Sequence, residues 1–226
     1  MTRVFVVVEG QTEESFIKDV LGPVLWPRQV FLYPILVGSP GHRGGNTSYV
    51  RVKKDIVAQL KQDPTACCST MLDLYGLGKG FPGTPLPENL TSLQKASRIE
   101  TAVREDFVVS VPELRPEIRL LPYLQLHEYE ALLFSDPAAF ADGIHMPHLA
   151  SQFGKIRADF QTPEDINDDA NTAPSKRVLT LHSSYRKVLD GPQAAKAVGI
   201  EAMRRECPHF REWVERLEAF EGKRSS

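Results

Sequence analysis

The run RVFVVV at residues 3–8 constrains the fold most, because after its arginine every side chain is β-branched or aromatic and no polar residue alternates with them. A strand with this pattern is covered on both faces, as in a parallel sheet. Residues 30–37, VFLYPILV, predict a second strand, and Pro34 favours an edge position because proline donates no hydrogen bond to a neighbouring strand. Residues 67–73, CCSTMLD, predict a third strand that ends on an acid.

Helical periodicity follows between and after these strands. It predicts helices over residues 49–62 and 91–108, and a final amphipathic helix over residues 208–220. Strands that alternate with helices favour βαβ units. With 226 residues, of which 42% are hydrophobic, the chain can bury one sizeable core. We therefore predict an α/β fold, with a parallel sheet flanked by helices over residues 1–135 and a mostly helical C-terminal extension packed on it over residues 136–226.

Composition narrows the class of protein. The formal net charge of −2 gives no overall basic field, so we expect only weak, modestly salt-dependent binding to generic duplex DNA. Three cysteines, two of them adjacent, form neither a disulfide framework nor a zinc-binding spacing. No apolar stretch approaches the ~20 residues of a membrane span, and the first apolar run is too short for a signal peptide. These features predict a cytoplasmic protein without a membrane segment.

Two of the predicted strands end on carboxylates. Glu9 follows the first strand and Asp73 ends the third. A buried carboxylate without a partner is costly, and ligand sites of open α/β sheets lie at the carboxyl ends of the strands. If the two strands are neighbours, Glu9 and Asp73 repel each other unless a cation lies between them, and hard oxygen ligands suit Mg²⁺ or Mn²⁺. The alternative is that each acid is a turn or helix-cap residue.

The segments VEGQTEE (8–14) and MLDLYG (71–76) resemble the Toprim domain of topoisomerases, primases and overcoming-lysogenisation-defect nucleases. This resemblance implies a Toprim-like sheet in which Glu9 and Asp73 are catalytic ligands of Mg²⁺. It adds Glu13, the acid four residues after Glu9, to the same catalytic and metal-binding set. The chain resembles more closely the bacterial domain-of-unknown-function family 4276, through VEGQTEE, LDLYGLGKGFPG, PYLQLHEYEALLF, PEDIND, APSKR and CPHFREW.

One departure from the Toprim pattern concerns its Asp-x-Asp motif, which here ends on Tyr75. Tyrosine supplies no second carboxylate, so a full two-metal site needs another acid. The segment HEYE offers Glu128 and Glu130, whose spacing places them on opposite faces of a strand or about 200° apart on a helix. We favour Glu128 as the catalytic and metal-binding acid, with His127 as ligand, phosphate contact or general base. The alternative is a surface acid at a helix start.

Basic and hydroxyl side chains in three segments are candidates for contact with a substrate phosphate. The candidates besides His127 are Arg43, Lys79, Ser175, Lys176 and Arg177. We assign Lys176 the further catalytic role of stabilising charge that develops on phosphate. Their alternative is a set of solvated charges on a loop and a helix cap. The acids of residues 164–168 are better explained as turn and cap residues than as a third metal site.

The first functional hypothesis is a metal-dependent nuclease that hydrolyses phosphodiester bonds of DNA or RNA. Resemblance to the overcoming-lysogenisation-defect nucleases implies a partner ATPase of the ABC/AAA type and a role in antiphage defence. The second hypothesis is a regulatory subunit that binds nucleic acid or a protein partner through a degenerate site and does not cleave. Either role is compatible with a homo-oligomer. A phosphatase-like hydrolase is disfavoured because the chain lacks an Asp-x-Asp nucleophile pair.

Overall fold

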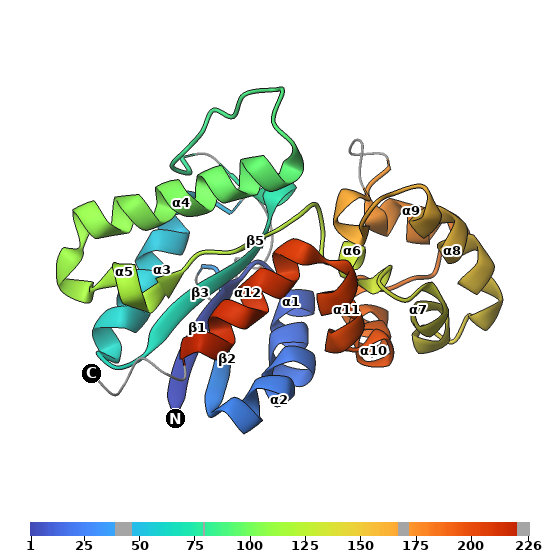
Figure 1. Cartoon of the computed structure of the whole chain (residues 1–226), viewed down its shortest axis with the longest axis horizontal. Coiled ribbons are helices and arrows are strands. Elements are labelled where there is room, and N and C mark those ends of the chain that lie inside the picture. The colour runs from blue at the N-terminus through green and yellow to red at the C-terminus, as the bar shows by residue number, and fades with distance from the viewer. Residues whose placement is uncertain (39–46, 79, 167–171, 221–226) are drawn as a thin grey trace.

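The computed structural model describes residues 1–38, 47–78, 80–166 and 172–220. Within these ranges the sheet has five strands, and every pairing between them is parallel. Their order is β2-β1-β3-β4, and β5 also pairs with β3 (Figure 1). The strands are β1 (Thr2–Val8), β2 (Val30–Leu36), β3 (Cys67–Asp73), β4 (Leu120–Leu121) and β5 (Leu124–Gln125). The predicted α/β fold with a parallel sheet is therefore confirmed.

Strand β1 lies in the middle of the sheet, between β2 and β3. Its valines are fully buried because they alternate between two core clusters: Val4, Val6 and Val8 face one, and Val7 faces the other. Strand β2 is at the edge, as Pro34 predicts. Parallel pairing of β1 with β3 brings the carboxyl ends of these two strands to the same edge of the sheet.

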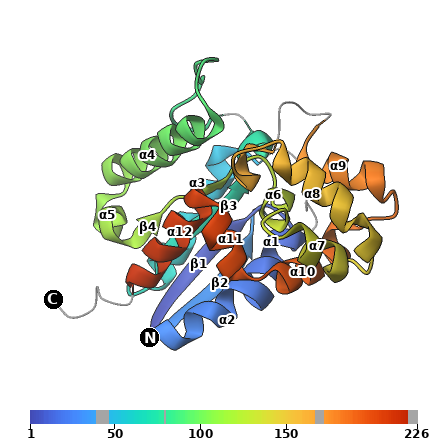
Figure 2. The same ribbon diagram turned by 45° about the vertical axis from the view of Figure 1, so that its right-hand side comes forward.

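Helices cover both faces of the sheet (Figures 1 and 2). The predicted helix over residues 49–62 is confirmed as α3, which buries its apolar stripe with α4 in one core cluster. The other face is covered by α1, α2 and the last helix, α12. The helices up to the end of the sheet are α1 (Gln11–Phe16), α2 (Gly22–Leu25), α3 (Tyr49–Gln62), α4 (Ser92–Ser110) and α5 (Pro116–Arg119).

The C-terminal region is helical, as predicted. Its helices are α6 (Glu130–Leu133), α7 (Pro137–Gly143), α8 (Ala150–Ala158), α9 (Pro174–Leu181), α10 (Lys187–Val198), α11 (Ile200–Glu206) and α12 (Pro208–Glu218). Helix α12 returns to the sheet, where Trp213 Nε1 donates a hydrogen bond of 2.9 Å to Ser69 Oγ on β3. The extension and the sheet thus share one apolar core. No helix of the described ranges is long and apolar enough to cross a membrane.

The buried carboxylate of Glu164 holds the start of α12. Its oxygens accept hydrogen bonds from the backbone amides of His209 (3.0 Å) and Phe210 (2.9 Å), two donors that the first turn of a helix leaves unpaired. Asp165 forms a capping box with Thr162. Glu164 and Asp165 are therefore cap and turn residues, as expected of this segment. Asn167 and Asp168 lie outside the described residues.

Replacing Glu164 with alanine should destabilise the protein by about 2–4 kcal/mol, because two buried amides lose their acceptors at once. Urea unfolding followed by circular dichroism measures this change. Glu212→Ala is the matched control on the exposed side of α12, and we expect it to stay within about 0.5 kcal/mol of the parent. An equal effect of the two variants would contradict a capping role for Glu164.

Candidate functional site

The carboxyl edge of the sheet brings Glu9 and Asp73 together. Glu9 comes directly after β1, and Asp73 is the last residue of β3, its parallel neighbour. A 3-10 turn, Leu74–Gly76, follows Asp73 and packs on the Glu9 carboxylate. A Cβ atom at Gly76 would lie 2.7 Å from Glu9 Oε2, so this approach requires glycine. The two acids therefore lie at one edge of the sheet, as the strand pattern predicts.

Two more buried acids join them. Glu13, on α1, is 4% exposed, and Glu130, the first residue of α6, is fully buried. We refer to Glu9, Glu13, Asp73 and Glu130 as the carboxylate cluster. The ammonium of Lys187 links three of its members: Nζ lies 3.1 Å from Glu130 Oε2, 3.8 Å from Glu13 Oε1 and 3.9 Å from Asp73 Oδ2.

The carboxylate cluster carries more negative charge than its lysine can balance. Burial, together with the neighbouring Glu13, Glu9 and Glu130, raises the pKa of Asp73 well above its ordinary value, and Lys187 offsets this only in part. Burial also raises the pKa of Glu130 to about 7 and, with the charge of Glu13, raises the pKa of Glu9. Burial alone would lower the pKa of Lys187, but the facing carboxylates raise it on balance. The cluster is thus short of positive charge.

The donor atoms suit a divalent cation. Glu9 Oε2, Asp73 Oδ1 and Glu130 Oε1 are buried and accept no hydrogen bond, and hard carboxylate oxygens are the ligands that Mg²⁺ and Mn²⁺ prefer. In the part of the chain that the structure describes, however, no three His, Cys, Asp or Glu side chains are grouped closely enough to hold a metal ion. The oxygen donors are therefore of the kind that binds Mg²⁺ or Mn²⁺. Their spacing is instead that of carboxylates whose charge is partly balanced by Lys187.

The HEYE segment divides its two acids between different partners. Glu128 Oε2 accepts a hydrogen bond of 3.0 Å from the backbone amide of Ser175 at the start of α9. It is Glu130 that contacts Lys187, although the charge of Glu128 also raises the pKa of Glu130. His127 is 2% exposed and stacks on the ring of Tyr75, with centroids 5.2 Å apart. Glu128 therefore connects α9 to the site, and Glu130 belongs to the cluster itself.

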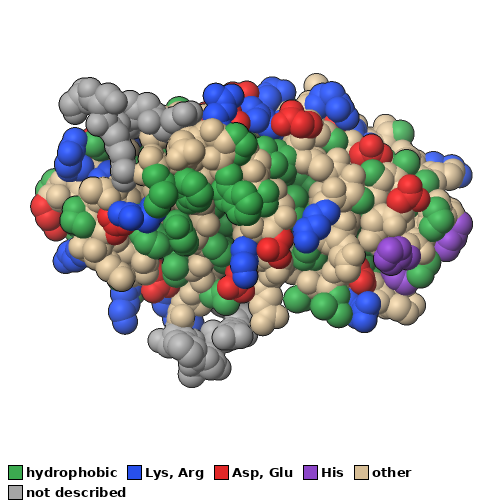
Figure 3. Space-filling view, turned by 90° about the horizontal axis from the view of Figure 1, so that it is seen from below, with side chains coloured by type: hydrophobic (Ala, Val, Ile, Leu, Met, Phe, Trp, Pro, Cys, Tyr) green, Lys and Arg blue, Asp and Glu red, His purple; other side chains and the backbone are tan. Residues whose placement is uncertain are grey.

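The phosphate-contact candidates differ in their surroundings. Ser175 and Lys176 lie at the start of α9, and Lys176 is exposed. Arg177 is engaged within the fold, where its Nε donates to the Thr172 carbonyl at 2.7 Å and its guanidinium lies 5.1 Å from the centroid of the Phe160 ring. Arg43 and Lys79 lie outside the described residues. Lys and Arg are interspersed with Asp and Glu on the face drawn in Figure 3, in keeping with the near-neutral net charge.

Lys187 was not among the residues that sequence patterns single out. It reaches the cluster because α10 packs against α6 and α1 at Gly191. A Cβ atom there would lie 3.3 Å from Tyr129 Cε1 and 3.5 Å from Thr12 Cγ2, and the Tyr129 hydroxyl donates to the Gly191 carbonyl at 3.1 Å. The sequence does predict an excess of acids at the sheet edge, which needs a nearby positive charge. It does not indicate which basic residue supplies that charge.

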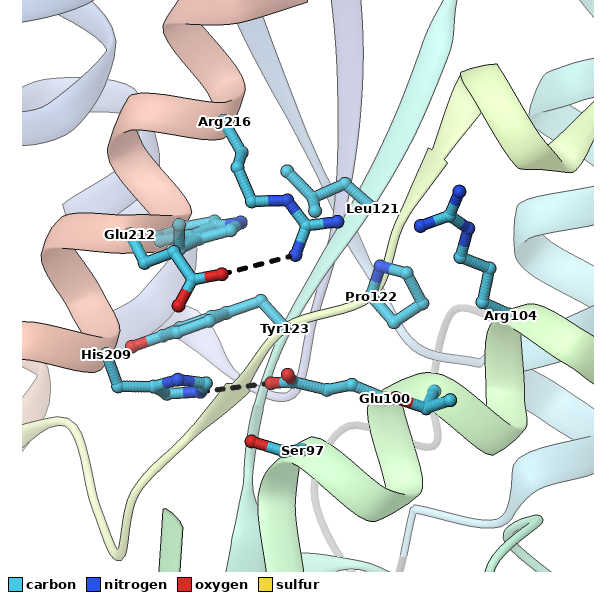
Figure 4. A pocket seen from close by; sticks show the side chains of 11 residues that line it. Ser97, Glu100, Arg104, Leu121, Pro122, Tyr123, His209, Glu212 and Arg216 are labelled. Atoms are coloured by element: carbon cyan, nitrogen blue, oxygen red, sulfur yellow. Dashed lines mark hydrogen bonds and ion pairs between the residues drawn. The ribbon is translucent and has the colours of Figure 1, made fainter. Parts of the chain in front are cut away.

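A separate pocket of about 190 Å³ lies between α4 and α12 (Figure 4). Glu100 and His209 meet within it at 3.0 Å, and Tyr123 stacks between His209 and Trp213 with centroids 5.0 and 4.2 Å away. Arg104 and Arg216 extend on opposite sides of Pro122 in the same view. None of the predicted site residues that the structure describes lines this pocket. The contact of Glu100 with His209 connects α4 to α12. The carboxylate cluster is not part of this pocket.

A family model described as a domain of unknown function, DUF4276, matches residues 8–218. No curated protein and no solved structure matches the chain. The matched range includes every member of the carboxylate cluster and Lys187.

Proposed function

The chain belongs to the DUF4276 family, a domain of unknown function, and from its carboxylate cluster we propose that it is a metal-dependent nuclease that hydrolyses phosphodiester bonds of DNA or RNA. The observation that carries this proposal is the gathering of four acids at the carboxyl edge of a parallel sheet, with one ammonium against three of them. Glu13 and Glu130 of this set are buried, and Glu9 and Asp73 are partly buried. Three of these acids keep a buried oxygen without a hydrogen bond. Excess charge and open acceptor atoms both favour a further cation, Mg²⁺ or Mn²⁺.

The acids and the lysine have different parts in this proposal. Glu9, Glu13 and Asp73, together with Glu130, would hold the cation, which when bound supplies the Lewis acidity for phosphodiester hydrolysis. The ammonium of Lys187, whose side chain is 36% exposed, would stabilise charge that develops on the phosphate. Without the cation the pKa of Glu130 is about 7, so a cation that binds near neutral pH would displace a proton from this carboxyl.

The start of α9 supplies the second group of substrate contacts. Glu128 fixes this helix by accepting from the Ser175 amide, which leaves the exposed Lys176 free to approach a phosphate oxygen. Lys176 therefore keeps the proposed role of stabilising charge, alongside Lys187. His127 and Ser175 stay proposed phosphate contacts next to Glu128.

The proposed biological setting rests on resemblance to Toprim nucleases of the overcoming-lysogenisation-defect type. We propose that the protein acts in the cytoplasm as an effector in bacterial antiphage defence, with an ABC/AAA-type ATPase as its partner. Homo-oligomerisation would be compatible with this arrangement.

The second candidate function is a regulatory subunit that binds nucleic acid or a protein partner without cleaving. Lys187 favours it, because the ammonium sits among the carboxylates where a catalytic cation would be expected. Tyr75 favours it too, since it stands where the Toprim pattern has a second acid. In this case Lys187 would serve as a permanent internal counterion.

A cleavage panel tests the proposed function. The protein is incubated with DNA, mRNA or tRNA in Mg²⁺, Mn²⁺ or EDTA, with and without an ATPase of the proposed partner type. We expect cleavage that requires the cation and that Asp73→Asn abolishes, while Glu212→Gln, purified in the same way, cleaves normally. Equal cleavage by the parent and Asp73→Asn would reveal a contaminant, and the absence of cleavage under every condition would favour the regulatory subunit.

A further inference from the structure

Tyr75 is an exposed aromatic residue beside the carboxylate cluster. It lies two residues after Asp73, in the turn Leu74–Gly76, and is 59% exposed, whereas Leu74 is buried. Gly76 of the same turn lies so close to the Glu9 carboxylate that a Cβ atom there would be 2.7 Å from Oε2. A large exposed ring at this position adds little to the core, and it is available for contact with a ligand beside the proposed reaction centre.

The ring of Tyr75 stacks on a buried neighbour, His127. The His127 imidazole stacks on it at an interplanar angle of 17°, and His127 adopts a left-handed backbone conformation with φ of 64°. A residue other than glycine is uncommon in this conformation and tends to mark a functional site when the surrounding fold enforces it. Its stack with a buried residue restrains the Tyr75 ring before any ligand arrives, and such restraint lowers the entropic cost of stacking on it.

We propose that Tyr75 is a stacking platform for a nucleobase next to the scissile phosphate, so that the substrate is single-stranded nucleic acid or an unpaired end. This proposal rests on the proposed nuclease function. Stacking on an aromatic side chain requires a base that has left the duplex, and it tolerates any base because every base has a π-face. Tyr75 lies two residues after Asp73 in the chain, so the proposal places the base of a phosphodiester bound at the carboxylates against this ring.

Stacking explains why this position carries tyrosine. A second acid there, as in the Toprim pattern, would add a fifth carboxylate to a cluster that already lacks positive charge. Tyrosine instead offers a flat uncharged surface at the mouth of the site. The competing structural role, shielding His127 from water, would also be met by an aromatic ring, but it would give no preference for substrates that carry bases.

Binding measurements test the proposal without relying on catalysis. A fluorescently labelled single-stranded oligonucleotide with non-hydrolysable phosphate linkages and an abasic oligomer of the same length and linkage are titrated in Mg²⁺ at low ionic strength, and anisotropy gives their dissociation constants. We expect Tyr75→Ala to weaken binding of the oligonucleotide about tenfold and to leave binding of the abasic oligomer unchanged. Tyr75→Phe should bind within twofold of the parent, since its ring is preserved.

Tyr33→Ala is the matched control, because Tyr33 is also exposed but lies on the edge strand β2 against Phe5. It should leave both dissociation constants unchanged. The proposal is overturned if Tyr75→Ala binds the oligonucleotide as the parent does, if it weakens both ligands equally, or if the parent does not prefer the oligonucleotide over the abasic oligomer. Failure of the nuclease function alone looks different: the binding differences persist while no cation supports cleavage.

Discussion

Lys187→Met is expected to destabilise the metal-free protein by about 2–4 kcal/mol at pH 8. The lysine is the ion-pair partner of Glu130, Glu13 and Asp73, and its removal leaves these buried carboxylates without a counterion. Breaking a fully buried pair in this way costs about 3–5 kcal/mol, and the 36% exposure of the Lys187 side chain screens part of that cost. Chemical unfolding in EDTA measures the change.

The same variant should lose less stability in acid. Glu130 has a folded pKa of about 7, raised from 4.5, so its protonated form is favoured in the fold. Its contribution to stability is fully present below about pH 4.5 and is lost as the pH rises through about 7. Without the ammonium of Lys187 the carboxylates are harder still to ionise. Lys187→Met should therefore lose more unfolding free energy at pH 8 than at pH 5.

Lys196→Met is the matched control for Lys187→Met, because Lys196 is an exposed lysine on the same helix, α10. We expect it to change stability by less than about 0.5 kcal/mol at either pH. If Lys187→Met proved as stable as the parent at pH 8, the lysine would not be the counterion of the cluster. In that case the acids would be neutral in the folded protein without it.

The sequence predicts the carboxyl edge of the sheet well, because the relevant patterns lie within single elements or pairs of strands. Strand β1 is apolar because both of its faces are covered, and α3 shows its buried stripe in its own periodicity. The edge position of Pro34 and the shared edge of Glu9 and Asp73 follow from hydrogen-bonding rules that hold within one strand or one pair of strands.

The rest of the candidate site depends on contacts between distant segments, which local patterns do not encode. Strands β4 and β5 have two residues each, too few to show a period of two. The different partners of Glu128 and Glu130, namely the Ser175 amide and Lys187, cannot be read from the spacing of the HEYE segment. Lys187 itself is placed by the packing of α10 on Tyr129, more than fifty residues away in sequence.

Glu9→Gln should leave the metal-free protein folded and make it more stable by up to roughly 1–2 kcal/mol, since it removes one charge from a repulsive cluster. Burial and Glu13 already raise the pKa of Glu9, and its Oε2 atom accepts no hydrogen bond that the substitution would break. Glutamine has nearly the same size, so Gly76 can still pack against it. Asp73→Asn should behave alike.

The same two substitutions should abolish cleavage and eliminate the stabilisation that Mg²⁺ gives to the parent. A cation that binds only the native state raises the melting temperature, and it no longer does so when its ligands are lost. Melting curves of the parent and both variants, with and without Mg²⁺, measure this response. Glu14→Gln, a change of the same chemistry one residue from Glu13, should keep both the cleavage and the Mg²⁺ response. If Glu9→Gln instead destabilised the metal-free protein and kept the Mg²⁺ response, Glu9 would be a structural partner at the sheet edge and the cation would bind elsewhere.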